Sequence, residues 1–490
     1  MTRSKFLNKF SVLLFTFTGI LVMGYHPGIE DDGVYLAAIK SRLDPMLYPR
    51  DADFFRLQLQ ASQFDTWMAW FSRMAHLPVG WAVLLVQFAA IFLVLWAGRF
   101  ILRYLFEDPK AVWGGVALLS AMLTLPVAGT ALYIADQHLH PRILATALAM
   151  LALTRILKRQ YWLALPLLLV GFLMHPIMGA FGFSFAFFLW LAHSNWKPGW
   201  FQAGHASLAL ALPLSWLTDP PTTIWHKALE SRQYMNLYHW EWYEWLGALA
   251  PILLFGILWR VARGRGDEKL SRFALAVFAF AVFQQLVAFV MLTPPQFIRL
   301  LPLQPMRYLQ LVYIFLLLLG GALLGKYLLR SRIWLWCVYL LLINLGMFVG
   351  QQQLYPATAH FELPGFDSGN KWLQAFDWIR NNTPVNAYFA LDPRYLKRDG
   401  EDYHSFRALA ERSQMADDIK DTAVVVLAPS LGPRWERETD ALANWQNFKL
   451  PDFERLKRDF GVDWVLVDLN QDPGLDCRWH NGTLAVCKIP

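Results

Sequence analysis

Long apolar segments separated by short polar loops fill the first 350 residues of the chain. A helix needs about 20 apolar residues to cross a bilayer, because each residue adds about 1.5 Å to its length. This pattern predicts roughly eleven transmembrane spans, two of them short, with the first span kept uncleaved. The predicted spans are residues 6–24, 79–101, 111–134, 143–155, 160–174, 176–193, 201–217, 246–262, 271–292, 306–325 and 333–350.

Basic residues gather in alternate loops between these spans. The loops that would face the cytoplasm hold most of the Lys and Arg, including the group between Arg260 and Arg272, and the opposite short loops hold few. Since basic loops stay on the cytoplasmic side of a membrane, we expect the N-terminus in the cytoplasm and the C-terminal domain in the periplasm or outside the cell. The expected location is a bacterial inner (plasma) membrane.

The composition divides the chain into two parts. Residues 1–350 are predicted to form the transmembrane domain, which includes a first outer loop at 25–78. Residues 351–490 have the composition of a soluble protein, and their alternating helix and strand patterns predict a small extracytoplasmic α/β domain. The expected fold is mainly α, a polytopic transmembrane helical bundle of about 11 spans followed by this domain.

Bulk composition agrees with a membrane protein. Hydrophobic residues make up 56% of the chain and charged residues 17%, whereas about 25% of a soluble protein is charged. The net charge of +7 lies in short loops between apolar segments, so we expect membrane lipid as a partner and no nucleic acid. No dinucleotide, P-loop or zinc-site motif is present, and three Cys residues are too few for a disulfide framework.

The first outer loop holds two apolar stripes with helical spacing. One stripe includes Val34, Tyr35 and Ile39, and the other includes Phe64 and Met68. Both stretches suit helices that lie along the membrane surface.

Three adjacent carboxylates, Glu30, Asp31 and Asp32, stand where the chain leaves the first predicted span. Adjacent carboxylates repel one another, so a cation, a metal ion or a protonated neighbour would stabilise them. One of the aspartates can cap a helix that begins at Gly33 or Val34, while the other faces a cavity. The two readings are compatible.

This acidic motif, in a long first outer loop with surface helices, resembles the GT-C glycosyltransferase superfamily. The resemblance covers the architecture of almost the whole chain, and it implies a sugar donor linked to polyprenyl phosphate. It also implies catalytic roles for Asp32 and Asp31, as the base that activates an acceptor or as ligands of a divalent metal. The stretches WIRNNTP and FRALAERS…DDIK resemble, more narrowly, an uncharacterised bacterial polytopic membrane-protein family with a C-terminal periplasmic α/β domain.

A second polar cluster, residues 136–142, precedes a short helix that Pro141 can start. A cation near a helix N-terminus is opposed by the helix dipole, so Arg142 is expected to have an anionic partner, either Asp136 or a donor phosphate. His138 is a candidate for the same phosphate contact and His140 for the substrate cavity, and ordinary loop packing is the alternative. A His-x-His pair alone is weak evidence for a metal site.

His175, beside a proline within apolar sequence, is costly unless it faces protein or water. It is either a satisfied interior histidine or a cavity residue. In the aromatic loop at 218–245, Trp240 and Glu241 are candidates for a sugar-binding wall, and an interfacial aromatic belt is the alternative.

Arg299 and Arg307 lie in the outer loop before the tenth predicted span. Guanidinium groups match phosphate oxygens with two parallel hydrogen bonds, so both are candidate ligands of the donor phosphate, together with Arg142. Snorkelling toward lipid headgroups is the alternative.

The C-terminal domain should contain a helix at 371–382, strands near 388 and 464, and a hairpin that turns at Asn481-Gly482. A tight turn there places Cys477 and Cys487 on opposite faces, whereas a bulged loop brings them together. The sequence does not decide between these two arrangements, so it does not decide whether the disulfide forms. A dense charged set between Phe406 and Lys420 either docks the domain onto the membrane part or reads a polar acceptor.

The function expected from these features is a membrane glycosyltransferase-like activity that moves a sugar from a polyprenyl-phosphate-linked donor to an acceptor at the outer face. Glu30, together with His140, His175, Trp240 and Glu241, would line the substrate cavity. The alternative is a non-catalytic component of cell-surface polysaccharide assembly. A transporter is disfavoured, because ionisable residues gather in outer loops rather than at mid-membrane depth.

Overall fold

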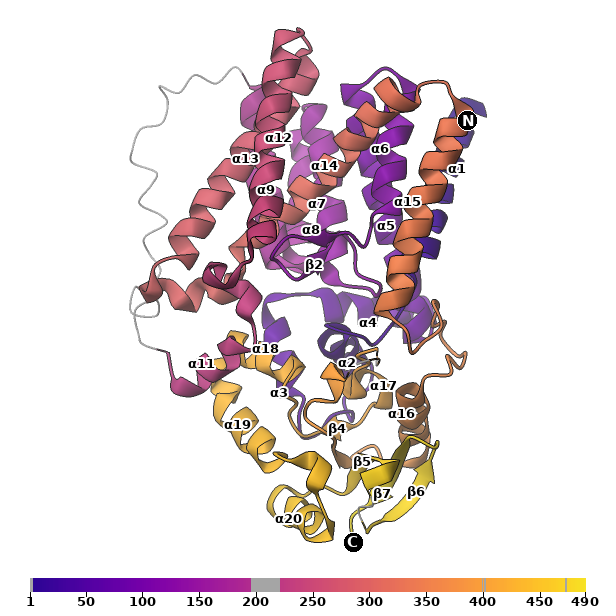
Figure 1. Cartoon of the computed structure of the whole chain (residues 1–490), viewed down its shortest axis with the longest axis vertical. Helices are drawn as coiled ribbons and strands as arrows, with labels where there is room; N and C mark the ends of the chain where they lie inside the picture. The colour runs from indigo at the N-terminus through magenta and orange to yellow at the C-terminus, as the bar shows by residue number, and fades with distance from the viewer. Residues whose placement is uncertain (1–2, 195–220, 399, 401, 472–473) are drawn as a thin grey trace.

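The computed structural model describes residues 3–194, 221–398, 400, 402–471 and 474–490, so the predicted span at 201–217 lies outside the described residues. Apolar helices occupy one end of the long axis and the C-terminal domain the other, and the two chain termini lie at opposite ends (Figure 1). The apolar end consists of α1 (Arg3–Met23), α5 (Val79–Leu105), α6 (Pro109–Ala121), α7 (Pro141–Leu157), α8 (Tyr161–Met174), α9 (Pro176–His193), α12 (Trp242–Gly264), α13 (Glu268–Leu292), α14 (Leu309–Leu323) and α15 (Ile333–Leu354).

Six helices within the described residues are long and apolar enough to cross a membrane, which makes the chain a multi-pass membrane protein. The predicted count of about eleven is not confirmed. The predicted span at 111–134 is wrong, because α6 ends at Ala121 and a hairpin of β1 (Pro126–Val127) and β2 (Leu132–Tyr133) follows. Pro126 has no backbone N–H and keeps the residue before it extended, so the helix cannot continue through it.

The first outer loop forms three helices, α2 (Asp32–Leu43), α3 (Asp53–Arg56) and α4 (Phe64–Met74). The expectation that α2 lies along the membrane surface stays a prediction, but α2 is not an exposed surface helix. Most of its residues are buried, because the C-terminal domain covers the side that the membrane helices leave open. Helix α4 is amphipathic, with Met68 buried and Trp70 exposed.

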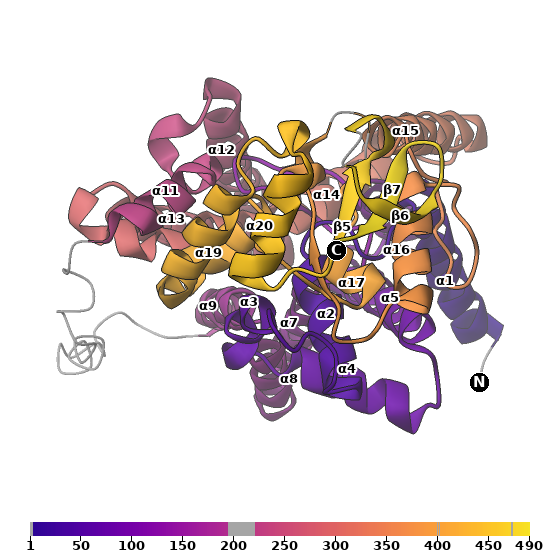
Figure 2. The same ribbon diagram turned by 90° about the horizontal axis from the view of Figure 1, so that it is seen from below.

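The C-terminal domain contains a small mixed sheet with helices on both faces, where the sequence predicts alternating helices and strands. Its strands lie in the order β4-β3-β5-β7-β6, with β3 parallel to β4 and β5, and β7 antiparallel to β5 and β6. The elements are α16 (Lys371–Asn382), β3 (Tyr388–Ala390), α17 (Phe406–Ala410), β4 (Ser413–Gln414), α18 (Lys420–Leu427), α19 (Gly432–Ala441), α20 (Leu450–Phe460), β5 (Trp464–Asp468), β6 (Asp476–His480) and β7 (Leu484–Lys488). Seen from below, these elements lie over the membrane helices beside α2, α3 and α4 (Figure 2).

The Cys477–Cys487 disulfide is present. The register of β6 and β7 pairs His480 with Ala485 and then shifts by one residue at Arg478, so that Cys477 lies opposite Cys487. A bulge of this kind, rather than a tight two-residue turn, brings the two cysteines together.

Backbone contacts with the C-terminal domain clamp the turn that holds the three carboxylates. The amide of Ser405 donates to the carbonyl of Gly28, and Ile29 forms an antiparallel bridge with His404. Gly33 fits only without a side chain, because a Cβ there would lie 2.5 Å from the Ser405 hydroxyl. The acidic turn is therefore held between the first span and the C-terminal domain.

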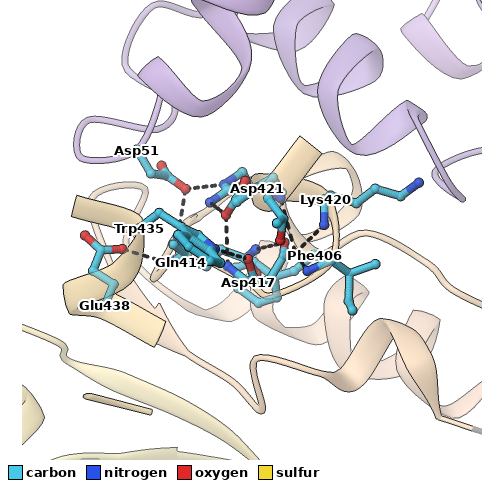
Figure 3. Close-up of polar contacts among 12 residues, drawn as sticks. Asp51, Phe406, Gln414, Asp417, Lys420, Asp421, Trp435 and Glu438 are labelled. Atoms are coloured by element: carbon cyan, nitrogen blue, oxygen red, sulfur yellow. Dashed lines mark hydrogen bonds and ion pairs between the residues drawn. The ribbon is translucent and has the colours of Figure 1, made fainter. Parts of the chain in front are cut away.

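A buried ion-pair network joins the first loop to the same domain (Figure 3). The Arg407 guanidinium donates to Asp51 of the first loop at 2.5 Å and to both oxygens of Asp421 at 2.6 and 2.8 Å. Asp51 also accepts from the Gln414 amide, and Asp417 accepts from the Lys420 amide. The network thus fixes the start of α18. Arg407 therefore docks the domain on the first loop, which is one of the two roles that the sequence left open for this charged set.

We expect Asp51→Asn to destabilise the protein by roughly 3 kcal/mol, because it leaves part of a buried guanidinium without its anionic partner. The thermal unfolding temperature of the purified full-length chain measures this loss. Asp53→Asn is the matched control, since Asp53 is an exposed carboxylate of the same loop and such substitutions change stability by about 0.5 kcal/mol or less. Equal unfolding temperatures for the two variants would contradict the role given to Asp51.

Candidate functional site

Asp31 is the accessible carboxylate at the centre of the candidate site. Its side chain is 42% exposed, and it lies 3.4 Å from the Lys420 ammonium, 3.4 Å from His140 Nε2 and 3.8 Å from the Arg142 guanidinium. Partial loss of water would raise the pKa of Asp31, but Lys420, His140 and Arg142 outweigh it and hold that pKa well below its usual range. Asp31 is therefore ionised throughout the physiological pH range.

Asp32 has a different role. It is buried, and its carboxylate accepts a hydrogen bond from the Gly28 amide at 2.8 Å. Burial raises the pKa of Asp32, against the opposing effects of His138, the Gly28 amide and Lys40. Neither aspartate side chain caps α2 in the way the sequence suggested, because Asp31 makes no cap hydrogen bond and Asp32 bonds backward to the preceding turn.

Arg142 has the anionic partner that its position at a helix N-terminus predicts. One guanidinium nitrogen lies 2.9 Å from each oxygen of Asp136, and both side chains are buried. Helix α7 begins at Pro141, as expected, with His140 as its N-cap. The preceding loop is fixed by Gln87 of α5, which donates to the Asp136 carbonyl.

Three histidines lie behind Asp31. His140 is buried, its Nδ1 accepts from the Arg142 amide at 3.0 Å, and its Nε2 faces Asp31. Its ring centroid lies 6.2 Å from that of His138 and 5.9 Å from that of His175. His175 accepts from the Met178 amide as the N-cap of α9, which fits the reading of a satisfied interior histidine. The buried His138 ring has no hydrogen-bond partner among the described residues.

Arg307, on the short 3-10 helix Pro305–Tyr308 before α14, approaches the same cluster. It lies within electrostatic range of Arg142, Asp31 and Tyr35. It also lines a small pocket with Tyr234. The Nε of Arg307 is buried without a partner, and the Arg307 guanidinium makes no hydrogen bond or ion pair with any residue that the structure describes.

Three other predicted residues lie apart from Asp31. Arg299 lines a separate pocket with Trp225 and Val426, next to the end of α18. Trp240 is buried, donates to the Tyr234 carbonyl and packs on the hairpin. Glu241 is exposed at the start of α12. Of the predicted residues, the structure therefore groups Asp31, Asp32 and Glu30 with His138, His140, His175, Arg142 and Arg307.

Lys420 belongs to the site, whereas the sequence placed it only in a charged set with a docking or acceptor-binding role. Its ammonium lies 2.7 Å from Glu30 and 3.4 Å from Asp31, and only 12% of its side chain is exposed. The acidic motif signalled a need for a cation, but nothing in the spacing of residues so far apart identified Lys420 as that cation.

A divalent metal at Asp31 and Asp32 does not fit the surrounding residues. Asp32 is turned to the Gly28 amide, and Asp31 faces the charges of Lys420 and Arg142, which would repel a metal ion. Within the described ranges, no group of three or more His, Cys, Asp or Glu side chains is arranged to hold a metal ion.

No protein-family model and no curated protein matches the sequence. The chain is similar to two solved structures of an oligosaccharyltransferase from Archaeoglobus fulgidus. One is the apo form, with 13% identity over 94% of this chain and 69% of that chain and a TM-score of 0.47. The other is AglB in complex with an inhibitory peptide and a dolichol-phosphate, with 12% identity over 96% and 70% and a TM-score of 0.46.

Folding should keep His140 neutral in mild acid. Burial lowers the pKa of the His140 ring from 6.5 to about 3, helped by the charge of Arg142. The unfolded chain protonates His140 as the pH falls below 6.5, whereas the folded chain does so only near pH 3. The contribution of the neutral ring to the stability of the folded state is therefore present above pH 6.5 and is lost as the pH falls toward 3. The free energy of unfolding should therefore fall, because of His140, by roughly 1.4 kcal/mol per pH unit between about pH 6 and 4.

His140→Asn keeps a side-chain oxygen to cap α7 but cannot titrate, so its unfolding temperature should fall less steeply with acid than that of the wild type. Thermal unfolding from pH 7.5 to 4.5 measures the two slopes. His480→Asn, at an exposed histidine, should keep the wild-type slope. Parallel curves for His140→Asn and the wild type would contradict the buried neutral ring.

Proposed function

We propose that the chain is a membrane glycosyltransferase-like protein that transfers a sugar from a polyprenyl-phosphate-linked donor to an acceptor at the outer face. The observation that carries the proposal is Arg307, a half-buried cation without an anionic partner among the described residues, in electrostatic range of the accessible carboxylate Asp31. A guanidinium that is partly withdrawn from water is stabilised by an anion. A donor phosphate would supply that anion beside the carboxylate that faces the sugar.

The phosphate end of the donor is assigned to Arg307. Its guanidinium matches phosphate oxygens with paired hydrogen bonds, and it begins a membrane-crossing segment, Pro305–Leu329, where a polyprenyl tail can remain in lipid. Arg142 is occupied by Asp136, so its part is to fix the position of Asp31 rather than to bind phosphate alone.

The sugar end is assigned to Asp31. In the transfer, the bond between the anomeric carbon and the phosphate oxygen breaks, and a bond from an acceptor oxygen or nitrogen to that carbon forms. The leaving phosphate departs as an anion that Arg307 stabilises, so the leaving group requires no general acid. An ionised Asp31 accepts the hydrogen bond of the attacking group and stabilises positive charge at the anomeric carbon. The acceptor's proton passes to Asp31 or to water.

The proposed orientation of the site relative to the membrane follows from the predicted location of the N-terminus. Helices α2 and α18, which carry the site, lie between the apolar helices and the C-terminal domain, at the ends of the apolar helices away from the N-terminus (Figure 1). With the N-terminus in the cytoplasm, as the basic loops predict, the site faces the periplasm or outer space. This is the side on which a lipid-linked donor would meet an extracytoplasmic acceptor.

Asp31→Asn should reduce transfer by about 100-fold or more, because an amide can neither accept the proton nor stabilise positive charge. The measurement is the transfer of labelled sugar by membranes that contain the full-length variant, with expression checked by immunoblot. Glu241→Gln is the control, since Glu241 is an exposed carboxylate away from the cluster, and it should retain activity. Wild-type transfer in Asp31→Asn would leave the acidic turn with a docking role and would favour the non-catalytic alternative.

Arg307→Gln should weaken binding of a polyprenyl phosphate by about tenfold or more, through loss of a charge-assisted pair. Arg307→Lys should restore only part of the affinity, because a point charge lacks the planar fork. Binding of the polyprenyl phosphate itself to the purified chain, by calorimetry or thermal shift, tests this without knowledge of the sugar. Arg299→Gln, in the separate pocket, should bind as the wild type does. An equal loss in both variants would point to general attraction to anionic lipid.

A further inference from the structure

Lys420 occupies a position between two carboxylates of the acidic turn. Its ammonium lies 2.7 Å from Glu30 Oε2 and 3.4 Å from Asp31 Oδ1, and its side chain is largely enclosed. The turn that presents Glu30 has a left-handed backbone at that residue, with φ of 50°. This conformation is uncommon for a residue other than glycine, and here the surrounding clamps hold it.

The position of Lys420 is fixed from its own side as well. Asp417 accepts from the amides of Ile419 and Lys420, and the neighbouring Asp421 is bound by Arg407. Figure 3 shows the Lys420 side chain extending away from this cluster, from the first residue of α18. The C-terminal domain therefore presents one ammonium at one place on the acidic turn.

We propose that Lys420 is a built-in cation of this site, which takes the place of a divalent metal between Glu30 and Asp31. Lys420 is thus a positioning residue, supplied by the C-terminal domain, that acts through Asp31. The role of Lys420 in catalysis rests on the proposed transferase function, but the effect of Lys420 on cation binding does not.

The charges near Asp31 explain why the wild-type turn should reject a metal ion. Two carboxylates, Glu30 and Asp31, already share the Lys420 ammonium, and Arg142 lies on the other side of Asp31. Like charges at such short range repel strongly near a protein surface, where water screens them only in part. The lysine alone would repel a divalent ion with twice the energy with which it would repel a monovalent ion at the same distance. Removing the lysine removes the nearer of these two cations, the one that lies between the carboxylates, and it leaves Arg142 on the far side of Asp31. Glu30 and Asp31 then offer the carboxylate oxygens that a hard cation prefers.

The test is Mn²⁺ binding to the purified full-length chain, read from the loss of the free Mn²⁺ signal in electron paramagnetic resonance. The wild type and Lys420→Arg should bind no Mn²⁺ at this turn. Lys420→Ala should bind about one Mn²⁺ per chain, at least tenfold more tightly than the wild type, and Lys420→Ala/Asp31→Asn should lose that binding. Lys420→Gln provides the same comparison if Lys420→Ala does not elute as a folded species.

Lys227→Ala is the matched control. Lys227 also bridges two carboxylates, Glu436 and Asp440, but on an exposed helix face, so its removal should create no tight site. The proposal is overturned if the wild type binds Mn²⁺ in a manner that Asp31→Asn abolishes, or if folded Lys420→Ala and Lys420→Gln gain no binding. The Mn²⁺ measurements do not depend on sugar transfer. Absence of transferase activity would therefore overturn the proposed function, but it would not change the result for Lys420.

Discussion

The burial of the Arg407 guanidinium is the constraint on which the half of the molecule with the C-terminal domain depends. A buried cation is tolerated only when anions and acceptors surround it, and the two carboxylates that pair with it come from different parts of the chain, Asp51 and Asp421. Separation of the C-terminal domain from the first loop would leave this charge without half of its partners. The domain is therefore fixed on the loop rather than tethered beside it.

This constraint extends directly to the candidate site. Asp421 follows Lys420 in α18, so the carboxylate that pairs with Arg407 also fixes the residue whose ammonium contacts Glu30 and Asp31. Hydrophobic packing supports the same arrangement, since one continuous core includes Phe64 of the first loop and Val425 of α18 together with the membrane helices. The acidic turn is thus positioned by contacts whose partners lie at the far end of the sequence.

Local signals in the sequence predicted the elements that depend on local interactions. Pro141 starts α7, the helix at 371–382 ends before Thr383-Pro384, and the apolar strand near Trp464 is β5. The end of α6 was missed because hydrophobicity continues past Ala121 although Pro126 stops the helix. Burial of α2 was missed because its apolar stripe does not show what covers the opposite side.

The site was only partly predictable for the same reason. The need of the acidic turn for a cation follows from repulsion between carboxylates, but any of the basic residues could have met it. Arg299 and Arg307 are close in sequence and were expected to act together. Gln304, between them, has a left-handed backbone with φ of 46°, and the chain turns there, so the two side chains line different pockets. Spacing along a loop of two 3-10 helices does not indicate which side chains share a face.

The two adjacent aspartates show how one turn assigns opposite properties to identical side chains. Helix α2 begins between them, so Asp32 lies against the preceding turn and Asp31 faces outward. Burial raises the pKa of Asp32, whereas Lys420, His140 and Arg142 lower that of Asp31 against the effect of desolvation. Carboxylates whose environments drive their pKa values apart are typical of sites that divide roles between two acids. Here the accessible acid is the one that stays charged, which suits stabilisation of positive charge at a sugar carbon better than retention of a proton. Because Lys420 supplies part of that effect, the electrostatic character of Asp31 depends on the C-terminal domain being in place.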